Sequence, residues 1–188
     1  MRNTKTAPGG NELLDANDLL KNKLGVTYGS YIADLGCGGI GFFVIKAAQI
    51  AGSDGVVYAV DILKSALANV EARARLLGLN NIKTVWSNLE KYGATKINND
   101  YLDFALLINI LFQSDDNAGI IKEAVRLLKP GGKLMVIDWQ AGRFPIGPKP
   151  EDKIPPEKLT GIAESLNLTV EKQFEAGKFH YGIVFGKE

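Results

Sequence analysis

Cysteine and histidine are nearly absent from this chain of 188 residues, which holds one of each. A single cysteine excludes an internal disulfide, and together with a single histidine it excludes a Cys/His zinc site. These counts do not exclude a metal site built from carboxylates, but no metal site is predicted. Neither sign of charge is in excess, because 22 basic and 21 acidic residues leave a net charge of +1. This balance argues against a nucleic-acid partner.

Long apolar runs are also missing. No stretch approaches the roughly 18 apolar residues that a membrane span needs, and residues 1–10 hold no apolar signal core. We expect a cytoplasmic protein that does not enter a membrane. With 46% hydrophobic and 23% charged residues, the composition is that of a globular protein. We predict a flexible tail over 1–10 and a single domain over 11–188.

Short apolar runs alternate with stretches of helical periodicity. The predicted strands cover 31–35, 56–60, 82–86, 102–108 and 133–138. The predicted helices cover 11–24, with Asp15 as the point where a break would fall, and 42–51, 63–77, 120–128 and 159–166. Two last strands, at 168–174 and 179–185, indicate an antiparallel hairpin. This order predicts an α/β fold, a Rossmann-like, doubly wound and mostly parallel sheet, with its ligand crevice at the carboxyl ends of the strands.

A glycine-rich turn follows the first predicted strand. Residues 36–41 read Gly-Cys-Gly-Gly-Ile-Gly, and Asp61 follows 20 residues after Gly41. Glycines at this spacing allow a ligand to approach the backbone, and the acid can bind ribose hydroxyls, as in dinucleotide-binding folds. The alternative is a tight strand-to-helix turn that binds nothing.

Asp34 distinguishes between the ligands that such a turn could bind. It lies two residues before Gly36, where its charge would repel the diphosphate of a dinucleotide. A carboxylate there suits a ligand that carries a sulfonium, an amino group and no phosphate. S-adenosylmethionine has this chemistry.

Three motifs together carry a family resemblance. Residues 34–38 read Asp-Leu-Gly-Cys-Gly, residues 57–61 read Val-Tyr-Ala-Val-Asp, and residues 127–134 read Leu-Leu-Lys-Pro-Gly-Gly-Lys-Leu. Over about 11–188 the chain resembles the class I S-adenosylmethionine-dependent methyltransferases, and most closely their small, menaquinone-biosynthesis-like branch. The resemblance implies a seven-stranded sheet with a C-terminal antiparallel hairpin, S-adenosylmethionine as cofactor, and methyl transfer.

The resemblance also assigns binding residues. Asp34 and the amides near Gly36 and Gly38 would face the methionine part, and Asp61 would accept from both ribose hydroxyls. The other cofactor-binding residues that it implies are Cys37, Gly41, Ile62 on the adenine face, Asn88 and Leu89 at the adenine edge, and Asn109 near the amino group or the methyl.

The chain departs from the family pattern in two places. One residue is inserted around Gly39 and Ile40, which displaces Gly41, and Asn88 stands where the family often has an aspartate. An amide oxygen can still accept a hydrogen bond from the adenine amino group. Asn109 has an alternative interpretation as a turn residue at the end of its strand.

Other residues have structural as well as functional interpretations. Cys37 is expected to be a small residue of the turn. His180 is expected to be a sheet histidine with a hydrogen-bond partner, on a face left open by Gly182 and Val184, rather than a catalytic base. Asp138 and Trp139 end the fifth strand, where they contact substrate or simply terminate the strand. The stretch 139–156, with its five prolines, is either a functional loop or a spacer.

We therefore predict an S-adenosylmethionine-dependent methyltransferase that acts on a small molecule, with no catalytic residue assigned and no prediction of its oligomeric state. Two alternatives remain. One is a non-catalytic domain that binds S-adenosylmethionine or S-adenosylhomocysteine, and the other is an NAD-dependent oxidoreductase.

Overall fold

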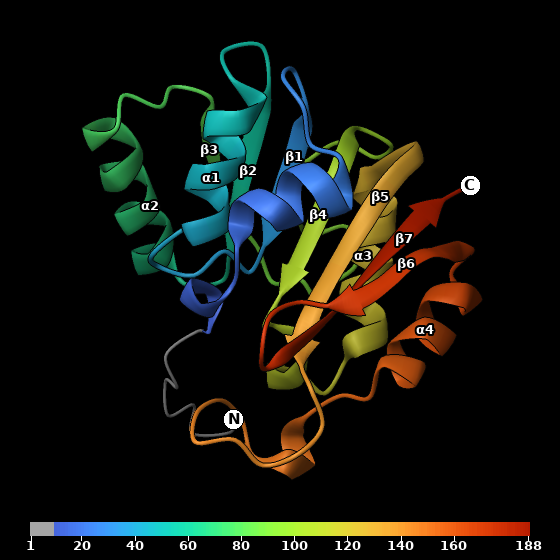
Figure 1. Ribbon diagram of the computed structural model, residues 1–188. Coiled ribbons are helices and arrows are strands. Elements are labelled where there is room, and N and C mark those ends of the chain that lie inside the picture. The colour runs from blue at the N-terminus through green and yellow to red at the C-terminus, as the bar shows by residue number, and fades with distance from the viewer. Residues whose placement is uncertain (1–9) are drawn as a thin grey trace.

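A single seven-stranded sheet organises the chain, as the computed structural model of residues 10–188 shows (Figure 1). The strands are β1 (Tyr31–Leu35), β2 (Val56–Asp61), β3 (Ile82–Trp86), β4 (Leu102–Ile108), β5 (Leu128–Trp139), β6 (Leu168–Glu175) and β7 (His180–Lys187). Their order across the sheet is β3-β2-β1-β4-β5-β7-β6. The pairs among β1 to β5 are parallel, whereas β7 runs antiparallel to β5 and β6. The predicted mostly parallel sheet with a C-terminal hairpin is confirmed.

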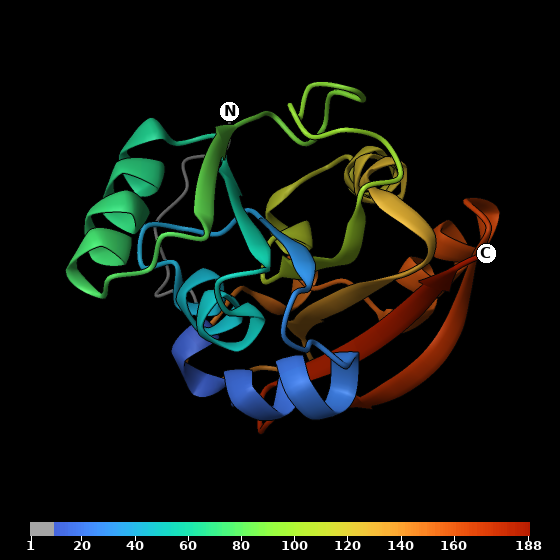
Figure 2. The same cartoon turned by 90° about the horizontal axis from the view of Figure 1, so that it is seen from above.

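Helices cover both faces of the sheet (Figure 2). One face packs against α3 (Asn117–Leu127) and α4 (Pro156–Ser165), and the other packs against α1 (Phe42–Ala51), α2 (Lys64–Leu76) and η2 (Asp18–Leu24). Alternation along β1 separates the two cores, because Ile32 faces one and Ala33 the other. Burial on both faces explains why β1 and β4 are apolar apart from Asp34 and Asp103.

The N-terminal helical segment is divided into two. A 3₁₀ turn, η1 (Asn11–Leu13), is followed by an extended residue, Leu14, and then by η2, which is a π-helix. Asp15 Oδ1 accepts hydrogen bonds from the backbone N–H groups of Asn17 and Asp18, at 3.0 and 3.1 Å. The Asp15 side chain thus caps the start of the second helical segment, and the break between the two segments falls where the sequence predicted it. Of the predicted tail, only Gly10 belongs to the described residues.

The Pro-Gly-Gly sequence at residues 130–132 lies within β5, which begins five residues before the predicted strand 133–138. β5 starts at Leu128, which pairs with Leu102, and pairing resumes at Lys133 opposite Phe104. The residues between form an irregularity in the ladder, where Gly131 has φ +77°. The chain also forms two short 3₁₀ turns, η3 (Leu111–Gln113) and η4 (Pro150–Asp152).

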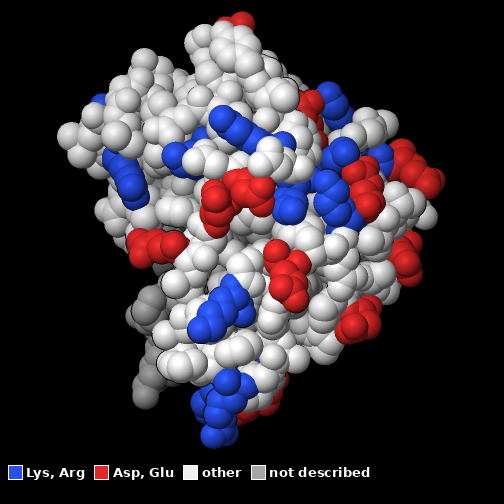
Figure 3. All heavy atoms as spheres, in the orientation of Figure 1, with Lys and Arg blue, Asp and Glu red and all other residues white. Residues whose placement is uncertain are grey.

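Charges of both signs are interspersed over the face of the molecule drawn in Figure 3. Among residues 10–188, no helix is both long and apolar enough to cross a membrane. Within the same range no three His, Cys, Asp or Glu side chains are grouped so as to hold a metal ion.

Candidate cofactor and acceptor pockets

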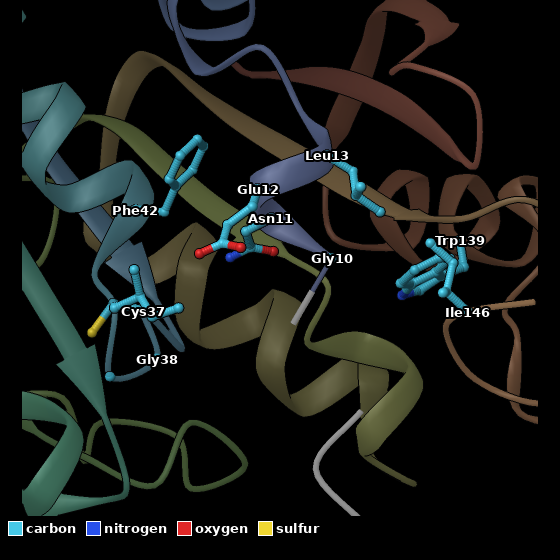
Figure 4. Close-up of a pocket in the computed structure, with 11 residues that line it drawn as sticks. Gly10, Asn11, Glu12, Leu13, Cys37, Gly38, Phe42, Trp139 and Ile146 are labelled. Atoms are coloured by element: carbon cyan, nitrogen blue, oxygen red, sulfur yellow. The ribbon is translucent and has the colours of Figure 1, made fainter. Parts of the chain in front are cut away.

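Two cavities of about 370 Å³ each open beside the glycine turn. The first, which we call the acidic pocket, lies at the carboxyl ends of β1, β2 and β3 and is lined by Gly36, Gly38, 61–63, 87–90, Ile110, Gln113, Ser114 and Ile120. The second, the apolar pocket, is lined by Gly10, η1, residues 37–40, Phe42, Trp139 and Ile146 (Figure 4). Gly38 lines both cavities, so they meet at the glycine turn.

The glycines of the turn are needed for different structural reasons. At Gly36, with φ +88°, a Cβ would lie 2.0 Å from Ile110 Cδ1, and at Gly41, with φ +58°, it would lie 2.7 Å from Val70 Cγ2. These two glycines allow close packing of strand, turn and helix. At Gly38, with φ +64°, a Cβ would meet nothing within 4 Å. The space beside Gly38 is therefore open to a ligand.

Asp61 connects β2 to the glycine turn. Its Oδ2 accepts a hydrogen bond from Gly38 N at 2.9 Å, and its Oδ1 accepts from Leu63 N at 2.9 Å. The side chain lines the acidic pocket. Each carboxylate oxygen retains a lone pair, so both can accept a further hydrogen bond from a ligand.

Asp34 is the most electrostatically perturbed acid beside the turn. Asp34 is 3% exposed. Burial, and then the negative charge of Asp61, raises the pKa of Asp34 to about 7. Two carboxylates held close together in the protein interior favour a bound cation. Asp34 is not among the residues that line either cavity, and it lies beneath the turn at the end of β1.

The predicted adenine contacts lie in the acidic pocket. Ile62 is 53% exposed there, an unusual exposure for isoleucine, and its carbonyl accepts a hydrogen bond from Trp86 Nε1 at 2.8 Å. Asn88 Oδ1 accepts from Glu90 N at 3.0 Å, which stabilises the turn after β3. Leu89 is buried beside it. The structure thus brings Asp61, Ile62, Asn88 and Leu89 together, as the sequence analysis predicted.

The amides of the glycine turn differ from the expectation. Gly36 N and Cys37 N both donate to Val60 O, at 2.8 and 3.0 Å, and Gly38 N donates to Asp61. These N–H groups stabilise the turn rather than point toward a ligand. Cys37 is buried, and burial followed by the charges of Asp34 and Asp61 raises the pKa of its thiol well above the usual value. A thiol that stays protonated suits the structural role expected for Cys37.

Asn109 adopts a turn conformation rather than lining a pocket. Its φ is +55°, and its side chain is 5% exposed. Its Nδ2 donates to Asn11 Oδ1 at 2.8 Å, and its carbonyl accepts from Gln113 Nε2 at 2.7 Å. These contacts match the alternative interpretation of Asn109. They fasten η1 over the end of β4.

His180 contradicts the expectation of an open face and a hydrogen-bond partner. It is 1% exposed, and its ring packs against that of Trp139 with the centroids 4.2 Å apart and the planes inclined by 42°. Its Nε2 has no hydrogen-bond partner among the described residues. Burial, followed by the charge of Lys153, lowers the pKa of His180 to about 4. The expectation failed because Trp139, opposite His180 on β5, covers the face.

Asp138 and Asp116 have structural roles. Asp138 is fully buried and accepts from Trp139 N at 2.8 Å and Phe112 N at 3.3 Å. Burial raises its pKa to about 7. Asp116 caps α3 by accepting from Gly119 N at 2.8 Å.

The sequence analysis missed most of the apolar pocket. Residues 10–13 were assigned to a tail and a helix, and Phe42 and Ile146 were not singled out. Trp139 was predicted to end the fifth strand, where it would contact substrate or simply terminate the strand. A Gly-containing N-terminus and a proline-rich loop carry no periodic signal that would place them against each other.

Comparison with known proteins supports the resemblance. Residues 28–181 match the family described as a methyltransferase domain. The chain is 31% identical over 132 residues to the ubiquinone/menaquinone biosynthesis C-methyltransferase UbiE of Francisella philomiragia, which covers 70% of this chain and 51% of that protein. It is also 31% identical over 120 residues to the arsenite methyltransferase of Aquipseudomonas alcaligenes, and the matched region covers 61% of this chain and 34% of that protein. The chain therefore spans about half, or less, of the length of these relatives.

Among solved structures, a SAM dependent methyltransferase from Aquifex aeolicus superimposes with a TM-score of 0.86 at 25% identity, over 96% of this chain and 94% of that one. A match to the family over residues 28–181, with the sheet order and the glycine turn described above, leads to one assignment. The chain belongs to the class I S-adenosylmethionine-dependent methyltransferases.

Proposed function

We propose that this chain transfers a methyl group from S-adenosylmethionine to a small-molecule acceptor, with residues 11–188 acting as one domain. The observation that carries this proposal is the pair of acids, Asp34 and Asp61, buried beside an open glycine turn. The lining of the acidic pocket includes Asp61 and Glu90 and, within residues 10–188, no lysine or arginine. A positively charged ligand without phosphate fits this lining.

The residues present fit an adenosyl ligand that carries positive charge. Asp61 would accept from the ribose hydroxyls, and the exposed side chain of Ile62 would pack on the adenine face. Asn88 and Leu89 would contact the adenine edge, and the second lone pair of Asn88 Oδ1 would accept from an amino group. Ionised Asp34 would attract the cationic methionine part across the turn. The open space beside Gly38 would admit the ligand to the backbone.

When bound, the cofactor supplies a methyl group that its sulfonium already activates. The protein then contributes position rather than acid–base chemistry. Gly38 joins the two pockets, so an acceptor in the apolar pocket would lie next to the cofactor site. Orientation of this kind can contribute roughly 7–11 kcal/mol to a reaction between two bound molecules. The apolar walls formed by Leu13, Ile40 and Phe42 would exclude competing water.

Both relatives named above are methyltransferases whose names refer to small molecules, namely arsenite and, in ubiquinone/menaquinone biosynthesis, quinones. A small acceptor is also supported by the size of the apolar pocket, about 370 Å³. Ligand sites commonly measure about 300–1,000 Å³, so this cavity suits a compact molecule.

An NAD-dependent reaction is disfavoured by the same electrostatics. A diphosphate placed at the glycine turn would lie beside the Asp34–Asp61 pair, with no basic side chain lining the acidic pocket to neutralise it. A non-catalytic binding domain would keep the acidic pocket but would need no acceptor site. The adjoining apolar pocket favours catalysis over binding alone.

Calorimetric titration tests the proposal. We expect S-adenosylhomocysteine to bind and NAD to show no measurable binding under the same conditions. A screen of small acceptors with isotopically labelled S-adenosylmethionine should then show label transfer. Tight binding of NAD without binding of S-adenosylhomocysteine would refute the proposal. Binding without transfer to any acceptor would favour the non-catalytic alternative.

A further inference from the structure

The apolar pocket contains a buried polar atom that has no partner in the part of the chain that the structure describes. Trp139 is 2% exposed, and among residues 10–188 its Nε1–H finds no hydrogen-bond acceptor. Figure 4 shows the nitrogen side of the indole turned toward Gly10 and the middle of the pocket. A buried N–H without a partner is costly, and native proteins rarely retain one unless water or a ligand satisfies it.

Two segments outside the core converge on this indole. A Cβ at Gly10 would lie 2.6 Å from Trp139 Cζ2, and a Cβ at Gly147, in the long loop after β5, would lie 2.5 Å from Trp139 Cζ3. On a third side His180 packs against the ring. The indole is therefore held in one orientation by η1, the loop and β7, so its N–H direction is fixed before any ligand arrives.

The lining of the pocket restricts the ligand. Its large side chains are Leu13, Ile40, Phe42, Trp139 and Ile146. Among the described residues that line it Glu12 is the only charged one, and Lys153, whose Nζ is 6.0 Å from the centroid of the Trp139 ring, is not part of this lining. An anion would therefore be desolvated there without a cationic partner in that lining. The aromatic rings of Phe42 and Trp139 favour flat, offset-stacked molecules. These features together select a neutral, flat and largely apolar compound.

We propose that the apolar pocket receives a neutral, flat, largely apolar methyl acceptor, and that Trp139 Nε1–H donates a hydrogen bond to a lone pair of that molecule. The proposal rests on the proposed function, which places the acceptor beside Gly38. Trp139 determines specificity, because it favours molecules with a hydrogen-bond acceptor over isosteric molecules without one. His180 is a positioning residue that holds the indole plane.

A matched pair of probes isolates the hydrogen bond. Quinoline and naphthalene have nearly the same shape, and only quinoline offers a ring-nitrogen lone pair. The protein, labelled with ¹⁵N and saturated with S-adenosylhomocysteine, is titrated with each probe while the two indole N–H resonances are followed by NMR. Trp86→Phe assigns them, because Trp86 is the other tryptophan and is 55% exposed. We expect quinoline to move the Trp139 resonance downfield and naphthalene to leave its hydrogen-bond shift unchanged.

The affinities provide a second measurement. We expect Trp139→Phe to weaken quinoline binding roughly fivefold to tenfold, the size of one hydrogen bond, and to leave naphthalene binding within about twofold. Trp86→Phe should change neither. We also expect 2-naphthoate, a flat anion, to bind more weakly than quinoline.

The outcomes separate this inference from the proposed function. If S-adenosylhomocysteine binds but the Trp139 resonance responds equally to quinoline and naphthalene, or to neither, the inference is overturned and the proposed function stands. Stronger binding of 2-naphthoate than of quinoline also overturns it. If S-adenosylhomocysteine does not bind, the proposed function fails, and the quinoline titration of the free protein still tests the pocket. The wild-type resonances decide the question even if Trp139→Phe does not fold.

Discussion

Replacing Asp34 with asparagine should stabilise the free protein at alkaline pH and weaken cofactor binding. Burial and then Asp61 raise the pKa of Asp34 from the ordinary 3.8 to about 7 in the folded chain. The folded state thus binds the proton more tightly than the unfolded state, so wild-type stability falls as pH rises from about 4 to about 7. The difference between the two pKa values corresponds to a loss of about 4 kcal/mol in the free energy of unfolding. About 2–3 kcal/mol of this falls between pH 5 and pH 8.

Cofactor binding should show the opposite pH dependence. Only ionised Asp34 attracts a cation, and its ionised fraction rises about tenfold between pH 6 and pH 8 for a pKa of about 7. The wild-type affinity for S-adenosylmethionine should therefore rise by up to about tenfold over this interval, with release of a proton on binding. Asp34→Asn should bind more weakly at pH 8, and its affinity should lack this rise.

Urea unfolding of both proteins at pH 5 and pH 8 measures the stability term, and calorimetry in buffers of different ionisation enthalpy measures the proton release. Asp138 also has a pKa raised to about 7, but it is present in both proteins and cancels in the comparison. A stability difference between wild type and Asp34→Asn that is the same at both pH values would refute the reasoning. So would equal affinities of the two proteins for S-adenosylmethionine at pH 8.

Three further predictions follow from single contacts. Asp61→Ala removes charged hydrogen bonds worth about 1.5–3 kcal/mol each and should weaken S-adenosylhomocysteine binding tenfold or more by calorimetry, and unchanged affinity in a folded variant would contradict the role of Asp61. Gly36→Ala should destabilise the fold by about 2 kcal/mol or more in urea unfolding, because it combines a left-handed φ with a clash against Ile110. Gly78→Ala is its control, since Gly78 has φ +66° but open space around it, and an equal loss in both variants would exclude the clash. His180→Gln should become more stable relative to wild type as the pH falls from about 6.5 to about 4, because the depressed pKa of His180 costs the wild type stability over that range, whereas Asp34 and Asp138 titrate in both proteins and cancel. Identical thermal melts of the two proteins across that range would contradict the neutral buried state of His180.

The sheet and the acidic pocket were predictable because their signals are local. The bounds of β1, β3 and β4 equal the predicted ranges. A strand buried on both faces reads as a continuous apolar run, and a parallel sheet brings the residues after its strands to one edge. Asp61, Ile62, Asn88 and Leu89 follow their strands directly, so position in the sequence was enough to place them together.

The apolar pocket depends on contacts between distant parts of the chain. The burial of His180 results from its pairing opposite Trp139 on β5, and that of Trp139 from Gly10 and Gly147. Nothing in the residues around His180 indicates these neighbours, and Gly182, two residues further along the strand, instead suggested that this face is open. Asn109 likewise turns toward Asn11 because the N-terminal segment packs across β4.

A comparison of two buried acids shows why Asp34 indicates a ligand and Glu123 does not. Glu123 is fully buried, yet its pKa is lowered to about 2, because hydrogen bonds from Arg126 and from the backbone N–H groups of Gly93 and Thr95 outweigh the effect of burial. Such an acid stabilises the folded chain by holding the loop after β3. Both influences on Asp34, burial and the charge of Asp61, act in the opposite direction. Ionised Asp34 destabilises the free protein at neutral pH, so a cation bound beside it stabilises the folded protein. S-adenosylmethionine, which carries the sulfonium charge, should therefore raise the melting temperature more at pH 8 than at pH 6 in wild type, and equally at both in Asp34→Asn.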